Sequence, residues 1–260
     1  MHKLESVLTD FLEKIGLATN INDMFAALER AAISLGFDNI SYTYVPSVIG
    51  NNLYQLSPIF LISQSYETKF ISHYVSEKLG QDDFTIKRIK HGDMTPMNWW
   101  GEAKMKTLTH KEQKVIEIAR NDYGIRHGIT IPTYSSNKGI AGISVTSSES
   151  NEVFSLLCKE RLKTIKAISQ IFNDRVLISP EILNNFMHPF LQKLTDTEKA
   201  VLKKLSQGVA PKKIAHDLNS SQKYVNNVIA ILRIKFGGIT RDQLLYAAGL
   251  MAFDELVDSK

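Results

Sequence analysis

The feature that most constrains this chain is a repeated switch of hydrophobic period. Near the N-terminus, apolar residues recur every three to four positions, which is the spacing of an amphipathic helix. The stretches 40–45, 58–62, 128–134 and 139–147 are instead short and rich in β-branched and other apolar residues. Such stretches predict strands, and here they come in adjacent pairs. Adjacent pairs favour an antiparallel sheet with helices on its faces over a doubly wound parallel sheet.

Helical spacing returns several times around the predicted strands. We expect helices over 4–15, from the Asn20–Asn22 turn to Gly36, over 66–79 before Gly80, from the Thr109–Glu112 capping box to Gly124, and over 151–172. Residues 81–100 follow no single period and leave room for one further short strand. These patterns predict an α+β fold. Its first 172 residues are expected to form an α/β/α sandwich around an antiparallel sheet of about five strands.

A break in the pattern divides the chain into two predicted domains. Residues 173–192 contain Pro180 and Pro189 and follow no clean period, which is typical of a linker. We therefore expect a first domain over 1–172, a linker over 173–192 and a second domain over 193–260.

The second domain is predicted to be all-α. Thr195 and Glu198 form a capping box, Pro211 suits the first position of the next helix, and residues 222–236 carry an apolar stripe at i, i+3, i+4 and i+7. A last helix follows at about 241–252. The helix that begins at Pro211, the short turn after it and the helix over 222–236 form a helix-turn-helix arrangement within this four-helix unit.

One face of the helix over 222–236 is polar, opposite its apolar stripe. Asn and Gln side chains can form paired hydrogen bonds with adenine, whereas Lys prefers guanine or phosphate. Lysines on the preceding helix suit phosphate contacts, which position a protein on DNA without reading its sequence. The residues predicted to face DNA are Lys212, Lys213, Ser221, Gln222, Lys223, Asn226, Asn227 and Arg233.

The distribution of charge agrees with a DNA-binding second domain. The chain has a net charge of +4, from 31 basic and 27 acidic residues. The first 190 residues hold 20 basic and 20 acidic side chains, whereas the last 70 hold 11 and 7. The positive excess therefore belongs to the C-terminal part, as expected of a nucleic-acid-facing module.

Composition narrows the class of protein further. With 260 residues, of which 43% are hydrophobic and 22% charged, the chain is neither collagen-like nor a disordered tail. Cys158 is the single cysteine, which excludes an intramolecular disulfide and fits a reducing compartment. The early acidic residues do not suit a signal peptide, and no apolar run is long enough to span a membrane. We therefore expect a cytoplasmic protein without a membrane partner, a metal site or a cofactor.

The second domain resembles the LuxR-type helix-turn-helix over about 194–250. The resemblance is carried by Leu194-Thr195-x-x-Glu198-x-x-Val201-Leu202, Gly208, Ile214-Ala215, Val225, Lys235-Phe236 and Arg241-x-Gln243. The chain departs from that family's usual residues at Thr197, where Arg is usual, at Lys213, where Glu is usual, and at Val228 and Ile231, where His and Asn are frequent. These departures affect the operator preference that could be transferred, rather than the fold.

The first domain resembles the autoinducer-binding domain of LuxR-type quorum-sensing regulators over about 10–172. Neither a phosphate-binding Gly-rich loop nor the pattern of a phosphorelay receiver is present. The resemblance is carried by Tyr66, Tyr74, Asp83, Pro96-x-x-Trp99, Gly124-x-x-x-Gly128 with Pro132, and Gly139 through Ser144.

This resemblance implies a site for an N-acyl-homoserine lactone between the sheet and a set of helices. Asp83 would accept the amide N–H, and Trp99 would donate to the lactone carbonyl. Tyr66 and Ser144 would address the amide carbonyl, because a buried amide needs partners for both polar atoms. Phe70 and Tyr74 would wall the pocket.

Several departures keep alternatives open in this pocket. Phe70 stands where Trp is usual, Phe84 stands where Pro is usual, and the stretch to Trp99 is one residue longer than usual. Asp82 therefore remains open as the acceptor in place of Asp83, and Trp100 as the donor in place of Trp99. A ligand other than a homoserine lactone also remains open.

The two resemblances together imply a ligand-responsive transcriptional regulator that binds double-stranded promoter DNA as a homodimer. The segments 151–172 and 241–252 are candidate dimer contacts, and RNA polymerase is a further implied partner. One alternative is a chain with an altered pocket that acts by pairing with another regulator. Another is an enzyme with a Ser144, His127 and Asp83 triad. The absence of a Gly-x-Ser-x-Gly motif weighs against that triad, so we expect no catalysis.

Overall fold

The computed structural model describes residues 2–46, 59–66, 68–105, 107–136, 139–179, 193–236 and 238–250. The chain divides into two compact units, a larger one with the elements up to Ile178 and a smaller one with the helices after residue 193. Residues 47–58, which join the first two predicted strands, and the predicted linker residues 180–192 lie outside the described residues. Among the helices that are described, none is long and apolar enough to cross a membrane.

A five-stranded antiparallel sheet forms the centre of the larger unit, as the strand pairs predicted. Its order is β2-β1-β5-β4-β3. The strands are β1 (Asn39–Pro46), β2 (Ile59–Ile62), β3 (Met97–Asn98), β4 (His127–Ser136) and β5 (Gly139–Ser147). Tyr42 pairs with Leu61 across β1 and β2, and Met97 pairs with Thr130 across β3 and β4. The short strand β3 is the fifth strand for which residues 81–100 left room.

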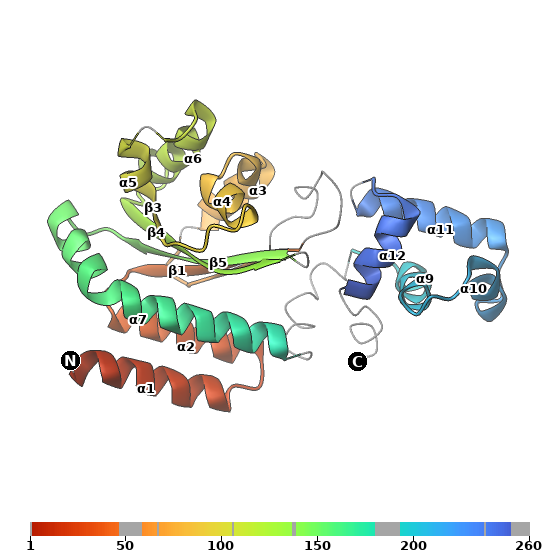
Figure 1. Ribbon diagram of the computed structural model, residues 1–260, viewed down its shortest axis with the longest axis horizontal. Helices are drawn as coiled ribbons and strands as arrows, with labels where there is room; N and C mark the ends of the chain where they lie inside the picture. The colour runs from red at the N-terminus through yellow and green to blue at the C-terminus, as the bar shows by residue number, and fades with distance from the viewer. Residues whose placement is uncertain are drawn as a thin grey trace. The chain divides into compact units, whose positions relative to one another are not determined.

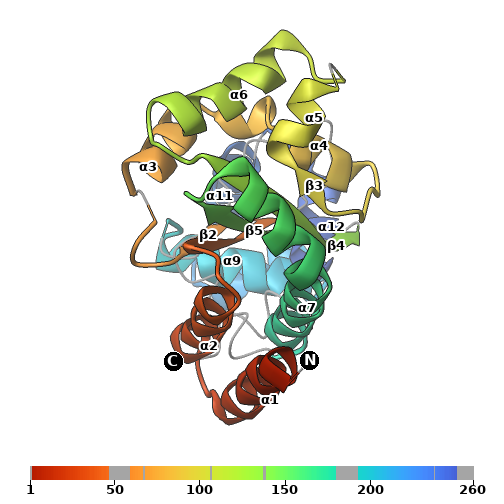
Figure 2. The ribbon, with the colours of Figure 1, turned by 90° about the vertical axis from the view of Figure 1, so that its left-hand side faces the viewer.

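Helices cover both faces of this sheet (Figures 1 and 2). One layer contains α2 (Ile21–Ser34) and α7 (Asn151–Ile178), and α1 (His2–Leu17) packs against both of these helices on their side away from the sheet. The other layer contains α3 (Thr68–Ser76), the 3₁₀ turn η2 (Leu79–Gln81), α4 (Phe84–Lys90), α5 (Trp99–Lys104) and α6 (His110–Asn121). The predicted capping box of Thr109 and Glu112 is present at the start of α6. The α/β/α arrangement predicted for this part of the chain is therefore confirmed.

The α7 side of the sheet is a mainly apolar core that contains a buried polar centre at Asn173. The Tyr42 ring of β1 meets the Phe172 ring of α7 edge to face, with centroids 5.1 Å apart. Beside them, the Asn173 Oδ1 atom accepts hydrogen bonds from the Tyr42 hydroxyl (3.1 Å) and the Thr133 hydroxyl (3.2 Å). Asn173 is fully buried, so these bonds satisfy polar atoms that water cannot reach.

Two helix boundaries in the larger unit differ from the prediction. We expected α7 to end at 172 and a linker to begin at 173, but the helix continues to Ile178. Phe172, Asn173 and Val176 are buried at helical spacing, so packing against the sheet extends the helix toward Pro180. The helix expected over 66–79 ends earlier, at Ser76, because Lys78 takes a left-handed conformation (φ 54°). Gly80 therefore does not end that helix.

In the described part of the smaller unit, four helices pack around an apolar core. They are α9 (Asp196–Ser206), α10 (Pro211–Asp217), α11 (Gln222–Lys235) and α12 (Arg241–Leu250). The predicted cap residues are in place, with a capping box of Thr195 and Glu198 on α9, Pro211 at the start of α10, and Ser221 as the N-cap of α11. The buried core residues are Leu194, Val201, Leu202, Leu205, Ile214, Ala215, Val225, Val228, Ile229, Leu232, Phe236, Ile239, Leu244 and Ala248.

A buried carboxylate joins the first and third helices of this unit. Glu198 Oε2 accepts hydrogen bonds from the Thr195 backbone N–H (2.7 Å) and from Lys235 Nζ (2.7 Å). Burial opposes ionisation of Glu198, but the Lys235 ammonium and the Thr195 donors outweigh it and lower the pKa of this carboxyl. The ionised side chain therefore stabilises the folded unit.

We predict that acid weakens the smaller unit through Glu198. Because the folded-state pKa is lowered, the stabilisation is complete above the ordinary pKa of glutamate and is lost as pH falls through the lowered folded-state value. Glu198→Gln should lower the protection of amide hydrogens from exchange in α9 and α11 at pH 7. It should also flatten the pH dependence of this protection between about pH 3 and 5. The exposed neighbour Asp196 provides the control, since Asp196→Asn should retain that dependence.

We also predict that Asn173 stabilises the larger unit. Asn173→Ala removes the acceptor that the Tyr42 and Thr133 hydroxyls share and should lower the free energy of unfolding by about 2 kcal/mol. Trp99 and Trp100 are the two tryptophans of the chain and both belong to this unit, so their fluorescence during urea unfolding measures it. Lys159→Ala, at an exposed position of α7, should change the midpoint little. An equal effect of both substitutions would contradict the role of Asn173.

Candidate functional site

A cavity lies between the sheet and the helical layer of α3 to α6. The volume that the centres of water-sized spheres can occupy in it is about 80 Å³. Its walls are mainly apolar and come from β1, β2, β4, β5 and the covering helices. The apolar lining residues are Val45, Phe60, Phe70, Ile71, Phe84, Ile86, Ile89, Val115, Ile116, Ala119, Ile140 and Ala141. The polar lining residues are Thr43, Tyr74, Asp83, Thr85, Trp99, Thr130 and Ser144.

The Asp83 carboxylate is the centre of one polar group in the wall. Asp83 is the N-cap of α4, and its Oδ1 atom accepts from the Thr85 backbone N–H (2.8 Å) and the Thr85 hydroxyl (2.7 Å). Its Oδ2 atom accepts from the Tyr74 hydroxyl (2.8 Å). The cap therefore holds a carboxylate acceptor at the cavity by bonds that also begin the helix.

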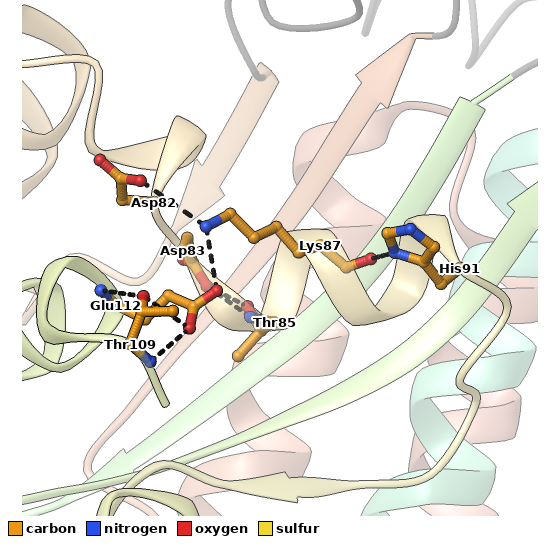
Figure 3. A network of polar contacts seen from close by, with 7 residues as sticks. All are labelled: Asp82, Asp83, Thr85, Lys87, His91, Thr109 and Glu112. Atoms are coloured by element: carbon orange, nitrogen blue, oxygen red, sulfur yellow. Dashed lines mark hydrogen bonds and ion pairs between the residues drawn. The ribbon is translucent and has the colours of Figure 1, made fainter. Parts of the chain in front are cut away.

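Asp82 has a different place, which Figure 3 shows. Its carboxylate lies 3.6 Å from Lys87 Nζ, and Lys87 also bonds to Glu112 on α6 at 2.9 Å. Burial opposes ionisation of Glu112, but the Thr109 donors and Lys87 lower its pKa overall. Asp82 is not among the cavity-lining residues, so the geometry favours Asp83 as the acceptor that faces a ligand.

A second polar group connects three elements of the wall. The Trp99 indole Nε1–H donates to the Thr130 hydroxyl of β4 (2.9 Å), and this hydroxyl also bonds to the Ser144 hydroxyl of β5 (2.9 Å). In this structure the Trp99 donor is thus already paired within the protein. The sequence predicted Trp99 as a donor to a ligand carbonyl, and such a contact would have to replace the bond to Thr130.

Gly128 allows Trp99 to lie against the sheet. A Cβ atom at Gly128 would come within 2.4 Å of the Trp99 ring, closer than any side chain can approach. Trp100 lies elsewhere, with the Arg120 guanidinium 4.3 Å from its ring centroid, and it is not part of the cavity lining. The geometry therefore favours Trp99 over Trp100 as the residue that faces a ligand.

The structure brings five of the six predicted ligand-site residues to this cavity. Phe70, Tyr74, Asp83, Trp99 and Ser144 line it. Tyr66 does not, although its ring lies against that of Phe70, with centroids 6.5 Å apart. Tyr66 is buried, which raises the pKa of its hydroxyl against the opposing effect of a hydrogen bond with Ser41. Tyr66 therefore supports the Phe70 wall from behind.

Thr85 and Thr130 are polar lining residues that sequence reasoning missed. Thr130 could have been found from the strand alternation, because it follows Gly128 by two positions and so shares its face of β4. Thr133 has the opposite parity and bonds to Asn173 on the other side of the sheet. Thr85 could have been found as the N2 residue of a helix whose N-cap is Asp83.

The residues of the hypothetical enzyme triad do not share the cavity. Ser144 and Asp83 line it, whereas the His127 ring stacks on Phe154 of α7 with centroids 4.5 Å apart. Burial lowers the pKa of His127, which is the effect of an apolar stacking environment. His127 therefore has a packing role against α7.

In the smaller unit, most of the residues predicted to face DNA are exposed. They are Lys212, Lys213, Gln222, Lys223, Asn226 and Asn227. Ser221 is also exposed, and its hydroxyl accepts the Tyr224 backbone N–H as the cap of α11. Arg233 differs, because it is half-buried and its Nε donates to the Ile239 carbonyl (2.7 Å). A structural role in closing the end of α11 therefore accounts for Arg233.

Comparisons with known proteins agree with the fold of the larger unit. The family described as "Autoinducer binding domain" matches residues 20–176. No curated protein sequence matches the chain. Among solved structures, the N-acylhomoserine lactone dependent LuxR family transcription factor CepR2 from Burkholderia cenocepacia aligns with 15% identity over 69% of this chain and 100% of its own, with a TM-score of 0.53.

Two structures of SdiA align over nearly the whole chain. SdiA in complex with octanoyl-rac-glycerol has 17% identity and a TM-score of 0.50 over 95% of this chain and 93% of its own. Escherichia coli SdiA in another structure has 18% identity and a TM-score of 0.48 over 96% and 98%. At these identities, the similarity to the CepR2 structure and to the SdiA complex is one of fold.

We predict that Gly128→Ala displaces Trp99 and disturbs the cavity. The added Cβ would force the indole away from β4 and break its bond to Thr130, at a cost of about 1–3 kcal/mol in the free energy of unfolding. Trp emission should shift, and near-ultraviolet circular dichroism should weaken. Gly101→Ala is the control, because its Cβ would meet its nearest atoms at an ordinary 3.5 Å. Unchanged spectra in the Gly128 variant would contradict this account.

Proposed function

The chain belongs to the autoinducer-binding domain family over residues 20–176, and from this premise we propose that it is a ligand-responsive, DNA-binding transcriptional regulator. The observation that carries the proposal is the apolar cavity with Asp83 as an acceptor in its wall. The smaller unit supports it with an exposed, polar face on α11. Binding of a small molecule in the larger unit would control binding of promoter DNA by the smaller one.

The cavity favours an uncharged ligand with an apolar part. None of the described lining residues is Lys, Arg or His, whereas Asp83 offers a carboxylate acceptor. An anionic ligand would therefore meet a like charge without a compensating cation, at a high desolvation cost. An amide N–H or a hydroxyl would complete the bonds around Asp83. N-acyl-homoserine lactones meet these requirements, and so do other uncharged acyl compounds.

A ligand of this kind would act by stabilising the larger unit. It would fill the cavity between the sheet and the helical layer. A ligand that binds only the folded state raises the population of that state. We propose that the stabilised chain forms a homodimer, since a single short recognition helix gives modest affinity and dimers bind two half-sites. The helices α7 and α12 are the proposed dimer contacts.

On DNA, α11 would enter the major groove and α10 would contact the backbone. Gln222, Lys223, Asn226 and Asn227 are exposed at the N-terminal half of α11, which is where recognition helices contact base edges. Lys212 and Lys213 on α10 would bind phosphates. RNA polymerase is a further proposed partner at the promoter.

One observation favours a second candidate function. Ile231 (47% exposed) and Ile234 (74% exposed) interrupt the polar surface of α11 with apolar side chains. Such side chains suit a protein partner better than phosphates, so the chain would in this case act by pairing with another regulator. A homodimer that binds no promoter fragment of its host, but binds a second regulator, would favour this candidate.

We predict that Asp83→Asn weakens ligand binding without undoing the start of α4. Asn is also a good N-cap, but its amide cannot accept a ligand N–H at the position of Oδ2. Affinity for N-octanoyl-homoserine lactone or octanoyl-rac-glycerol, measured by calorimetry, should fall about 10- to 100-fold. Asp82→Asn, which removes only the carboxylate near Lys87, should change it less than about threefold. Equal losses in both variants would remove Asp83 from the site.

We predict that Asn226→Ala and Lys212→Ala weaken DNA binding in different ways. Asn226→Ala should weaken the free energy of binding to a selected operator by about 1–3 kcal/mol and change binding to random DNA little, because base contacts carry sequence information. Lys212→Ala should weaken both and lower the salt slope by about 1. Fluorescence anisotropy over a range of salt concentrations measures both effects. If Asn226→Ala weakened both DNAs equally, its role in base recognition would be wrong.

A further inference from the structure

A second cleft adjoins the ligand cavity on the solvent side of α4. This outer cleft is lined by Phe84, Lys87, Arg88, His91, Asp93, Thr107, Leu108 and Glu112. Phe84 also lines the cavity, so one aromatic side chain belongs to both walls. Figure 3 shows the neighbouring Lys87 side chain reaching from α4 to Glu112. The two spaces therefore meet at Phe84.

Phe84 stands at the polar end of the cavity. It directly follows Asp83, and it belongs to the same apolar cluster as Met97, Ile116 and the flanking Trp99 ring. Only 3% of Phe84 is exposed, and the Arg88 guanidinium lies 5.6 Å from its ring centroid. The ring is thus held between the apolar cluster and Arg88, beyond the groups that would contact the polar end of a ligand.

The outer cleft suits uncharged polar groups. Lys87 is paired with Glu112 at 2.9 Å, and Arg88 with Glu102 at 2.8 Å. The cations that flank Phe84 therefore already have carboxylate partners, so an anion would gain little there. The Thr107 hydroxyl donates to the Glu102 carbonyl (3.3 Å), and His91 Nδ1 bonds to the Lys87 carbonyl (2.7 Å). The Thr107 oxygen can still accept a hydrogen bond, and the exposed His91 offers its other ring nitrogen. Hydroxyl groups of a ligand would fit this surface better than an apolar chain.

We propose that the Phe84 ring separates the cavity from the outer cleft. The ring thereby restricts the ligands of this protein to uncharged amphiphiles with a compact polar end. Removal of the ring would join the cavity to the outer cleft, and a polyhydroxyl extension of the ligand would then find polar surroundings. This inference rests on the proposed ligand function and adds to it the residue that sets the size of the polar end.

Two probes with the same tail and different polar ends test the proposal. Octanoyl-rac-glycerol has a compact end, and 6-O-octanoyl-glucose has a larger one. Calorimetric titrations below the micelle concentration give the ratio of their dissociation constants for each chain. The full-length chain and the variants Phe84→Ala, Phe84→Leu and Ile86→Ala are compared. Ile86 is the matched control, because it lies on the same helix and lines only the inner cavity.

We expect the unaltered chain to prefer the glycerol ester by about tenfold or more, since a larger group must displace a packed ring. Both Phe84 variants should reduce this preference by about tenfold, whereas Ile86→Ala should weaken both probes alike. If Phe84→Ala does not fold, Phe84→Leu decides, because it keeps an apolar side chain. An unchanged preference in the Phe84 variants, or an equal reduction in Ile86→Ala, overturns the proposal and leaves the ligand function intact. Binding of neither probe to any chain would contradict the ligand function itself.

Discussion

The hydrogen bonds of the Asp83 carboxylate are the interaction on which the site depends. One oxygen caps α4 through the Thr85 backbone and hydroxyl, and the other connects this cap to Tyr74 on α3. The same three bonds therefore begin a helix, join it to its neighbour and point an acceptor at the cavity. The start of α4 also fixes the positions of two further side chains. Phe84 comes to lie between the cavity and the outer cleft, and Lys87 reaches Glu112.

The sheet explains why one domain can hold a dense core and a cavity together. On one side, Tyr42 and Thr133 reach α7 and share the Asn173 acceptor. On the other side, Thr130 and Ser144 bond to each other beside Trp99. The alternation of side chains along β4 separates the two environments by one residue. The α7 side holds buried aromatic and polar contacts, and the opposite side holds the cavity between the strands and the helices α3 to α6.

Much of this architecture could be predicted from local patterns. The strand pairs, the capping boxes at Thr109 and Thr195, and the caps of α10 and α11 depend on residues close in sequence. The end of α7 could not, because packing of Val176 against the rest of the larger unit decides it. The helices α4 and α5 were missed because each is too short to show a period. The position of Tyr66 next to Phe70, outside the cavity lining, could not be predicted either, because a motif position does not tell which side of a neighbouring ring a side chain takes.

The pairing of the cavity's polar groups with one another has a thermodynamic consequence. The Trp99 N–H, the Tyr74 hydroxyl and the Thr85 hydroxyl each already donate to a protein acceptor. A ligand that engages one of them exchanges a bond rather than creating one, so it gains only the difference. A ligand that ignores them leaves no buried donor unsatisfied. Discrimination by hydrogen bonding is therefore weak on the donor side, and selectivity passes to shape and to the single carboxylate. Under the proposed ligand function, such a cavity would tolerate chemical variety among small molecules of similar size.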